Sequence, residues 1–294
     1  MPTFNEELFS KLHEMAFLGN TKPTSLSQLT HCTIYNAYTR AIFGASFPVS
    51  TYQDFDYVDH VVHMLFLPLP SFVSPAHRAR ARLLRAFADY MKPWKETAGN
   101  RDVPNVSQQG NQIIRALVKS GLSDLDNAGL LQAYLWGAIT NVVHITFWSI
   151  AHLMCDRTAL DAVRKDVDET CEREFDDLNT LLGATPAMLH KSGFRLLDSL
   201  FKEAGRLHLL PTSVREVSDD VDIPLSSRGG FRAKRGSAVV VDIPAIHGNE
   251  EYFPDAESFR VDRFLDGEST KYLYVWGKGE HMVGLLLKDG LSQS

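Results

Sequence analysis

The feature that most constrains the fold is a long stretch without a charged side chain, AGLLQAYLWGAITNVVHITFWSIAHLM, from residue 128 to residue 154. A helix of this length could cross a lipid bilayer or lie in the core of a globular domain. Gln132, Asn141, His144 and His152 interrupt the run, and their polar groups would be costly to expose to lipid. We therefore expect a central helix that is buried on all sides.

The rest of the chain up to about residue 192 has the apolar spacing of amphipathic helices. This spacing predicts helices over residues 9–17, 77–94 and 160–178, separated by short connections rich in Pro, Gly and Ser. The pattern changes after Leu210 to short runs that are typical of strands. The chain is therefore predicted to be mainly α with a small β-sheet.

The C-terminal part is predicted in more detail from its turn residues. We expect a strand at residues 213–217, a turn at Gly229 and Gly230, and a hairpin over residues 231–247 that turns at Arg235 and Gly236. Residues 250–267 resemble a loop with buried aromatic side chains. Residues 271–284 are expected to form a strand that enters a glycine-rich turn.

Composition excludes several classes of function. The chain has 294 residues, a hydrophobic fraction of 44% and a formal net charge of -6, so a globular core is expected and nucleic acid is not an expected partner. Cys32, Cys155 and Cys171 are too scattered for a disulfide framework or a zinc site, which favours a reducing compartment. The first residues mix charges and lack the apolar core of a secretory signal.

Two charged side chains lie three residues apart in FKEAGRLH, namely Glu203 and Arg206. On a helix they would be neighbours, and most such pairs are exposed contacts of little energetic value. Arg263 in SFRVDRF offers a second guanidinium, which would complete a buried and bidentate Glu-Arg-Arg cluster. We expect such a cluster to be structural, because it would pin a loop onto a helix.

These two motifs resemble the Glu-x-x-Arg helix and the downstream Phe-x-x-x-Arg-Phe clause of the cytochrome P-450 family. The resemblance runs from about Leu29 to Met282 and implies an incomplete cytochrome P-450 fold. It also implies that Glu203, Arg206 and Arg263 form the scaffold triad behind the haem.

The long apolar helix resembles the family's distal helix through LWGAITNVVHITFW, most closely in the branch of sterol 7-hydroxylases and prostacyclin synthases. The resemblance places Asn141 where the family has an acidic or amide residue that manages protons of dioxygen. Val142 stands where many members have Thr. Taken without the family, Asn141 is equally well interpreted as a core residue satisfied by a backbone carbonyl.

The segment VWGKGEHMVGLLL resembles the loop that holds the haem iron in this family. Trp276, Gly277, Gly279 and His281 agree with the family pattern and are implied to lie at the cofactor. The pattern's cysteine, the thiolate ligand of the iron, falls on Val283. Valine cannot ligate a metal, so no metal ligand is expected there.

Other side chains are weaker candidates for cofactor contacts. His281 normally faces a haem propionate at this place in the family, and a role as substitute iron ligand is the less favoured alternative. The resemblance also places Arg215 and His247 near the propionates or the haem edge. An ordinary surface side chain is an equal alternative for each of them.

The resemblance stops after Met282. We therefore expect a partial cytochrome P-450 domain over residues 1–282 and an unrelated tail over 283–294, in a chain truncated at both ends. The family's membrane anchor has no counterpart, so a cytoplasmic or endoplasmic-reticulum-associated location is expected. A phosphate-binding function of the glycine-rich segment is not expected, because the spacing of Gly277, Gly279 and Gly284 matches no nucleotide-binding motif.

The family resemblance implies a haem-dependent monooxygenase that takes electrons from a reductase and oxidises a sterol, another lipid or a secondary metabolite. Because the cysteine is missing, the sequence as it stands predicts an inactive, truncated form. One alternative is an active monooxygenase or isomerase whose true sequence differs after Met282. The other is a non-catalytic remnant that binds a hydrophobic ligand or a partner.

Overall fold

The computed structural model describes residues 7–8, 10, 25–67, 69–70, 73–184, 188–189, 193–209, 212–225 and 229–277. The chain divides into two compact units. The first contains Met1–Phe147 and Thr170–Ser192, and the second contains Trp148–Glu169 and Gly193–Ser294. The prediction of one partial domain over residues 1–282 stays a prediction.

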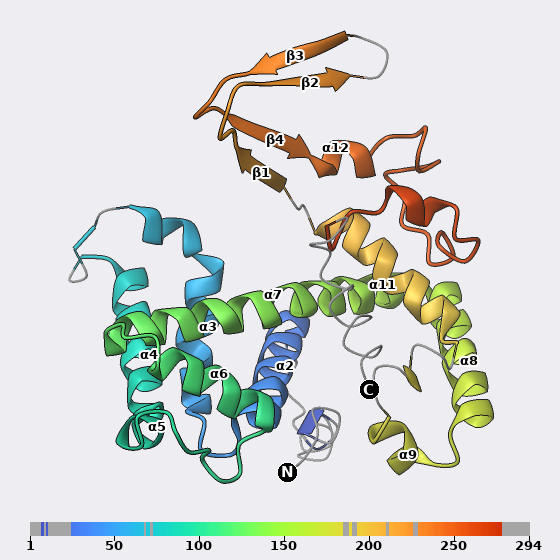
Figure 1. The fold of residues 1–294 in the computed structure, drawn as a ribbon. Helices are drawn as coiled ribbons and strands as arrows, with labels where there is room; N and C mark the ends of the chain where they lie inside the picture. Colours follow the sequence, from blue (N-terminus) through green and yellow to red (C-terminus); the bar gives the residue numbers. More distant parts are fainter. Residues whose placement is uncertain are drawn as a thin grey trace. The chain divides into compact units, whose positions relative to one another are not determined.

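The first unit is helical in the part that the structure describes (Figure 1). Serine side chains begin four of its helices, because Ser25, Ser74, Ser107 and Ser123 each accept a hydrogen bond from a backbone N–H of the first turn. Its elements are α2 (Leu26–Phe43), η1 (Val49–Thr51), α3 (Tyr52–His60), η2 (Val62–Phe66), α4 (Pro75–Tyr90), α5 (Lys92–Glu96), α6 (Gln108–Val118), the first part of α7 (Asp124–Cys155) and α9 (Leu178–Leu182).

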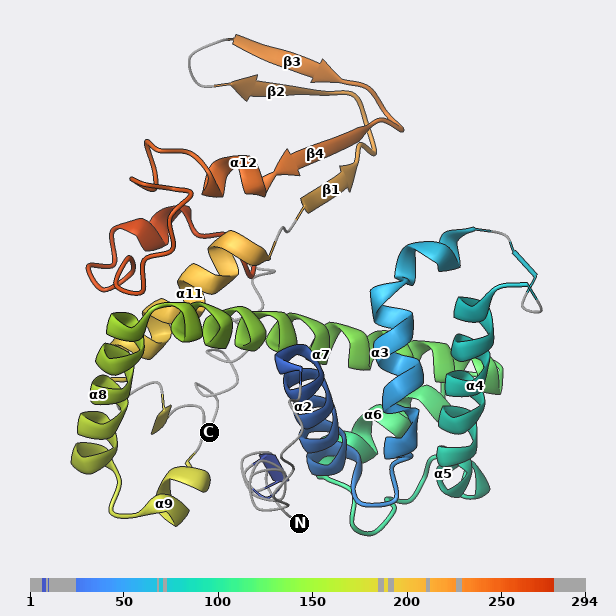
Figure 2. The ribbon, with the colours of Figure 1, turned by 180° about the vertical axis from the view of Figure 1, so that it is seen from behind.

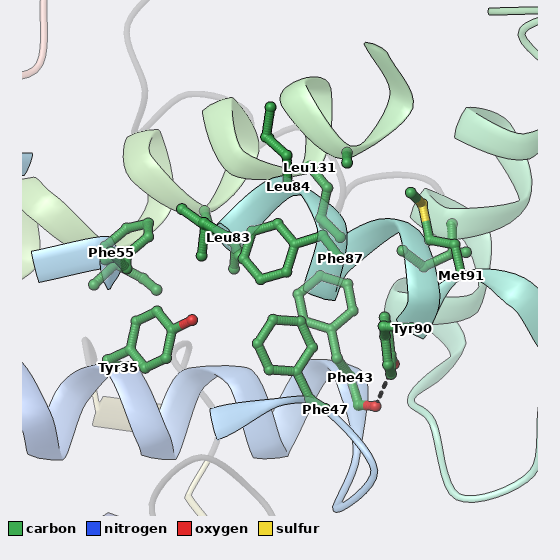
Figure 3. Close-up of a cluster of buried hydrophobic side chains, with 14 of the residues drawn as sticks. Tyr35, Phe43, Phe47, Phe55, Leu83, Leu84, Phe87, Tyr90, Met91 and Leu131 are labelled. Carbon is green, nitrogen blue, oxygen red and sulfur yellow. Dashed lines mark hydrogen bonds between the residues drawn. The ribbon is translucent and has the colours of Figure 1, made fainter. Parts of the chain in front are cut away.

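The core of this unit is built from aromatic and branched side chains of α2, α4, α6 and α7. Figure 3 shows Phe43, Phe47, Phe87 and Tyr90 packed against one another, with ring centroids 5.1–6.4 Å apart. The hydroxyl of Tyr90 donates a hydrogen bond to the carbonyl of Phe43 at 2.6 Å, so this buried polar group is satisfied. The predicted helix over residues 77–94 is confirmed as α4 and α5.

Helix α7 is not buried on all sides, and the prediction that it would be is wrong. Its side chains that belong to the main core form one stripe with helical spacing, Ala128, Leu131, Leu135, Ile139 and Val143. Trp136 and Val142 are exposed on other faces. By length and composition the helix could also cross a membrane, a test that core helices of soluble proteins pass as well.

The second unit combines helices with two small sheets. Its elements are the end of α7, most of α8 (Arg157–Glu174), α11 (Arg195–His208), β1 (Thr212–Glu216), β2 (Val221–Leu225), β3 (Gly229–Ala233), β4 (Ala238–Asp242), α12 (Ile243–His247) and η3 (Ser269–Tyr272). Helix α8 confirms the predicted helix over 160–178, although α8 ends at Glu174. The helix expected over residues 9–17 lies outside the described residues except for Ser10.

The four strands pair differently from the predicted hairpin. Figures 1 and 2 show β1 beside β4 and β2 beside β3, and both pairs are antiparallel. Val214 lies opposite Val240, and Ile223 lies opposite Phe231. The turn at Arg235 and Gly236 is where it was expected, but it connects strands of different sheets. Gly229 and Gly230 lie in β3, not in a turn.

The segment after α12 is irregular and encloses a small core of its own, as predicted. Phe253, Ala256 and Phe264 are buried there. The strand expected from residue 271 is wrong. Residues Ser269–Tyr272 form η3, and the ring of Tyr272 stacks on that of Tyr252 with centroids 4.3 Å apart.

Candidate functional site

The candidate site starts from α11, where two charged side chains are buried one turn apart. Glu203 is fully buried and Arg206 almost so. The guanidinium of Arg206 donates from Nε to Oε2 of Glu203 and from Nη2 to Oε1, both at 2.8 Å. This bidentate geometry is the strongest arrangement available to an Arg-carboxylate pair.

A second arginine reaches the same carboxylate from the loop that follows α12. Arg263 donates from Nε to Oε1 of Glu203 at 2.8 Å. Its Nη1 donates to the carbonyl of Pro254 at 2.6 Å, and its Nη2 donates to the carbonyls of Asp255 and Ser258 at 3.0 and 2.9 Å. The structure therefore brings the three predicted side chains together and ties the loop to α11.

The cluster has one negative and two positive groups, so a positive charge is buried. Carbonyl oxygens compensate for it, because Arg206 also donates from Nη1 to the carbonyl of His247 at 2.7 Å. The guanidinium of Arg206 lies 5.1 Å from the ring centroid of Phe253, which adds a cation-π contact. Each buried arginine is thereby held by several acceptors.

His247 links this cluster to the segment that precedes the glycine-rich turn. Its Nε2 accepts a hydrogen bond from the backbone N–H of Tyr274 at 3.0 Å, so the neutral ring carries its proton on Nδ1. That Nδ1 is buried and has no hydrogen-bond partner among the described residues. Burial lowers the pKa of His247 to about 4. The interpretation of His247 as an ordinary surface side chain is wrong, because it is 2% exposed.

The start of the glycine-rich segment packs on α11. A side chain on Gly205 would place its Cβ 3.1 Å from Cγ1 of Val275, so the glycine permits a close approach here. Trp276 is partly exposed, and Gly277 has a φ of +82°, a value that favours glycine. Gly279, His281 and Val283 lie outside the described residues.

Two other predicted residues are not part of this cluster. Asn141 lies in the first unit and is exposed, so it is not a core residue. Arg215 is exposed on β1 and donates to the carbonyl of Val214 at 2.9 Å.

Sequence reasoning missed a pair of histidines near the triad. Nε2 of His152, at the end of α7, lies 2.8 Å from Nε2 of His208, at the end of α11. The ring of Trp148 stacks on His208 with centroids 3.8 Å apart, and Phe259 stacks on His152 at 3.9 Å. The spacing of Trp148 and His152 on one helix face was the available signal, but their partners are far away in sequence.

Comparisons with known proteins agree with the geometry. A family model described as Cytochrome P450 matches residues 3–277. Cytochrome P450 7A1 of Oryctolagus cuniculus is 26% identical over 248 residues, covering 82% of this chain and 47% of that relative. Prostacyclin synthase of Bos taurus is 30% identical over 169 residues, covering 55% and 33%. The chain thus spans less than half the length of these relatives.

A third relative points to the same branch. The 25-hydroxycholesterol 7-alpha-hydroxylase of Rattus norvegicus is 26% identical over 160 residues, which cover 54% of this chain and 38% of that protein. The predicted resemblance to sterol 7-hydroxylases and prostacyclin synthases is therefore confirmed.

Proposed function

The chain belongs to the cytochrome P450 family, and from this premise we propose that its scaffold is that of a haem-dependent monooxygenase. The observation that carries the proposal is the buried cluster of Glu203, Arg206 and Arg263, which the family resemblance assigns to the scaffold behind the haem. We propose a sterol or another lipophilic molecule as substrate, supported by the names of the relatives. A reductase would be the electron-donating partner.

The residues present do not fit a thiolate-ligated haem. Val283 stands at the place of the ligand and has no donor atom. The three cysteines lie elsewhere, Cys32 on α2, Cys155 at the end of α7 and Cys171 on α8. Among the described residues, no group of three or more His, Cys, Asp or Glu side chains is placed to hold a metal ion.

We propose that the chain as given keeps the scaffold and lacks monooxygenase activity. In the intact family pattern, Trp276, Gly277, Gly279 and His281 would surround the cofactor, and Arg215 and His247 would lie near its edge. Asn141 would act on the distal side. The tail over residues 283–294 would contribute nothing to this site. The proposed location is the cytoplasm or the endoplasmic reticulum membrane.

The test is a spectrum of the purified chain after incubation with haemin. We expect no red-shifted Soret band of a thiolate-ligated haem when the reduced sample is exposed to carbon monoxide, because position 283 offers no sulfur. A stoichiometric band of that kind would contradict the proposal. Sequencing of the transcript across the codons for Met282 and Val283 tests the alternative that the true sequence differs there.

A pair of variants tests the scaffold itself. Val283→Cys restores a thiol at the family's ligand position, and Met282→Cys places the same thiol one residue earlier as a control. We expect the thiolate band in the first variant and not in the second. Equal spectra from the two variants would count against a haem pocket formed by this scaffold.

A further inference from the structure

A hollow of about 620 Å³ lies between α4 and the beginning of α7, within the first unit. We call it the α4–α7 hollow and define it by Arg80 and Leu84 on α4, Leu122 before α7, and Leu125, Asp126, Gly129 and Leu130 on α7. A smaller hollow of about 180 Å³ shares Arg80 and Gly129 with it and is also lined by Trp136. The larger volume is within the range of small-molecule sites, roughly 300–1,000 Å³.

The walls of the α4–α7 hollow are apolar and open to solvent. Leu122, Leu125 and Leu130 are 50%, 54% and 46% exposed, although leucine is usually buried. Leu84 completes the wall and also belongs to the main core (Figure 3). Apolar side chains gathered around one hollow indicate a site for an apolar molecule more strongly than scattered ones do.

A guanidinium lies at the junction of the two hollows. Arg80 donates from Nε to Oε1 of Gln132 at 3.2 Å, which orients the group. Within the described chain Arg80 has no carboxylate partner, whereas Arg82 on the same helix is paired with Asp54. Gly129 leaves room beside it, because an added Cβ would lie 3.7 Å from Nη2 of Arg80.

The carboxylates that line the hollows accept hydrogen bonds from groups other than Arg80. Oδ2 of Asp126 accepts from Oγ of Ser123 at 2.6 Å, and Asp126 lies in the first turn of α7, where the helix dipole stabilises a negative charge. Oδ1 of Asp59 accepts from Nε1 of Trp136 at 2.6 Å and from Oγ1 of Thr140 at 3.4 Å. The guanidinium of Arg80 is left to pair with an incoming anion.

We propose that the α4–α7 hollow binds an amphipathic carboxylate of the fatty-acid class. The carboxylate accepts hydrogen bonds from the Nη groups of Arg80, and the hydrocarbon chain lies along Leu122, Leu125 and Leu130. A charge-assisted contact of this kind fixes the head group, while burial of the chain supplies most of the affinity. The site needs no haem and does not depend on the proposed monooxygenase scaffold.

The experiment is calorimetric titration of the purified chain with oleate and with oleyl alcohol, each below its aggregation limit. We expect oleate to bind at least tenfold more tightly than the alcohol. Arg80→Gln should remove this preference and leave the affinity for the alcohol unchanged. Arg82→Gln, on the same helix but outside the hollow, should leave both affinities unchanged. Equal affinities for oleate and the alcohol, or no effect of Arg80→Gln, would overturn the proposal.

A second variant tests whether the ligand occupies the α4–α7 hollow, and it keeps the charge of Arg80. Gly129→Leu fills the space beside Arg80 and should weaken both ligands at least tenfold, with the helical content unchanged by circular dichroism. If it binds oleate normally, the ligand lies elsewhere. Sedimentation of the ligand-free chain tests self-association through the same leucines. A dimer that Leu125→Gln dissociates would assign this surface to a second copy and overturn the proposal.

Discussion

At the scale of single residues, the triad shows how a buried positive charge is tolerated. Glu203 compensates one of the two guanidinium groups, and the carbonyls of Pro254, Asp255 and Ser258 accept from Arg263. The backbone N–H of Arg260 also donates to Oε1 of Glu203, at 3.1 Å. Removal of the carboxylate charge would therefore leave two buried cations without a counter-ion, which costs more than losing one contact.

We predict that Glu203→Gln lowers the free energy of unfolding by about 3–5 kcal/mol, the range for breaking a buried ion pair. Urea denaturation followed by circular dichroism measures the change. The control is Lys202→Met on the same helix, where an exposed pair with Asp198 is lost and the expected effect is about 0–1 kcal/mol. Similar losses for the two variants would refute a buried role for Glu203.

Two histidines of the second unit make its stability depend on pH. Burial lowers the pKa of His247 to about 4 and, with the neighbouring His152, also that of His208 to about 4, from an ordinary value of 6.5. Between pH 6.5 and about 4, these two histidines bind protons in the unfolded chain but stay neutral in the folded chain. We therefore predict that the free energy of unfolding falls as the pH drops from about 6.5 to about 4.

Urea denaturation at several pH values measures this dependence. His247→Gln should reduce the slope between pH 4 and 6.5, because one of the shifted groups is removed. His63→Gln is the control, since His63 is exposed on η2 and should leave the slope unchanged. An equal slope in the wild-type chain and in His247→Gln would contradict the assignment.

At the scale of elements, two helical glycines differ in what surrounds them. A Cβ on Gly110 in α6 would lie 2.1 Å from the carbonyl oxygen of Ile42, whereas a Cβ on Gly137 in α7 would meet no atom of the described residues within 4 Å. We predict that Gly110→Ala destabilises the fold by about 1–3 kcal/mol through overpacking. Gly137→Ala should stabilise it by about 0.5–1 kcal/mol through helix propensity.

Thermal unfolding of the two alanine variants checks the prediction, because each serves as the control of the other. The substitution and the type of element are the same, so only the surroundings differ. Shifts of the melting temperature in the same direction would contradict the close contact between α6 and the end of α2.

Helices were easier to predict from this sequence than strand pairs. The pattern of α4 and α8 is local, because apolar side chains recur every three or four residues. The turn at Arg235 and Gly236 is also local, and it was located correctly. The pairing of β4 is not local. Val240 pairs with Val214, and the two strands of the other sheet lie between these residues in the sequence.

Short apolar segments were ambiguous for a related reason. Residues 271–276 alternate in a way that indicates a strand, but no neighbouring strand pairs with them among the described residues. Tyr272 instead stacks on Tyr252, and the backbone N–H of Tyr274 donates a hydrogen bond to Nε2 of His247. Side-chain contacts therefore take the place of the hydrogen bonds between strands that the alternating pattern predicts. The triad was predictable through the second arginine and the family resemblance, because Glu203 and Arg206 taken alone would most often be an exposed pair.

At the scale of the whole molecule, the long apolar helix shows the limit of composition. The lack of charge predicted burial, but only a stripe from Ala128 to Val143 is buried against the core. Composition states how apolar a helix is, not how many neighbours it has. The same holds for the leucines of the α4–α7 hollow, because their residue type predicts burial although Leu122, Leu125 and Leu130 are exposed.

The two compact units differ in the size of their cores, and this difference predicts different rates of hydrogen exchange. The first unit has a large cluster that includes Phe87, Trp94 and Leu131, whereas the identified cluster of the second is small and its sheets have two strands each. Two-stranded sheets are marginally stable by themselves. We predict slow hydrogen exchange in α4 and in residues 128–143, and exchange that is faster by orders of magnitude in β1–β4.

Hydrogen exchange measured by mass spectrometry tests this prediction directly. Glu203→Gln should accelerate exchange in α11 and in residues 254–264, because the triad ties them together, and should leave α4 unchanged. Gly110→Ala should accelerate α6 and α2 first. If either variant accelerates all segments equally, the chain opens as one cooperative unit, and the division into two compact units has no counterpart in its energetics.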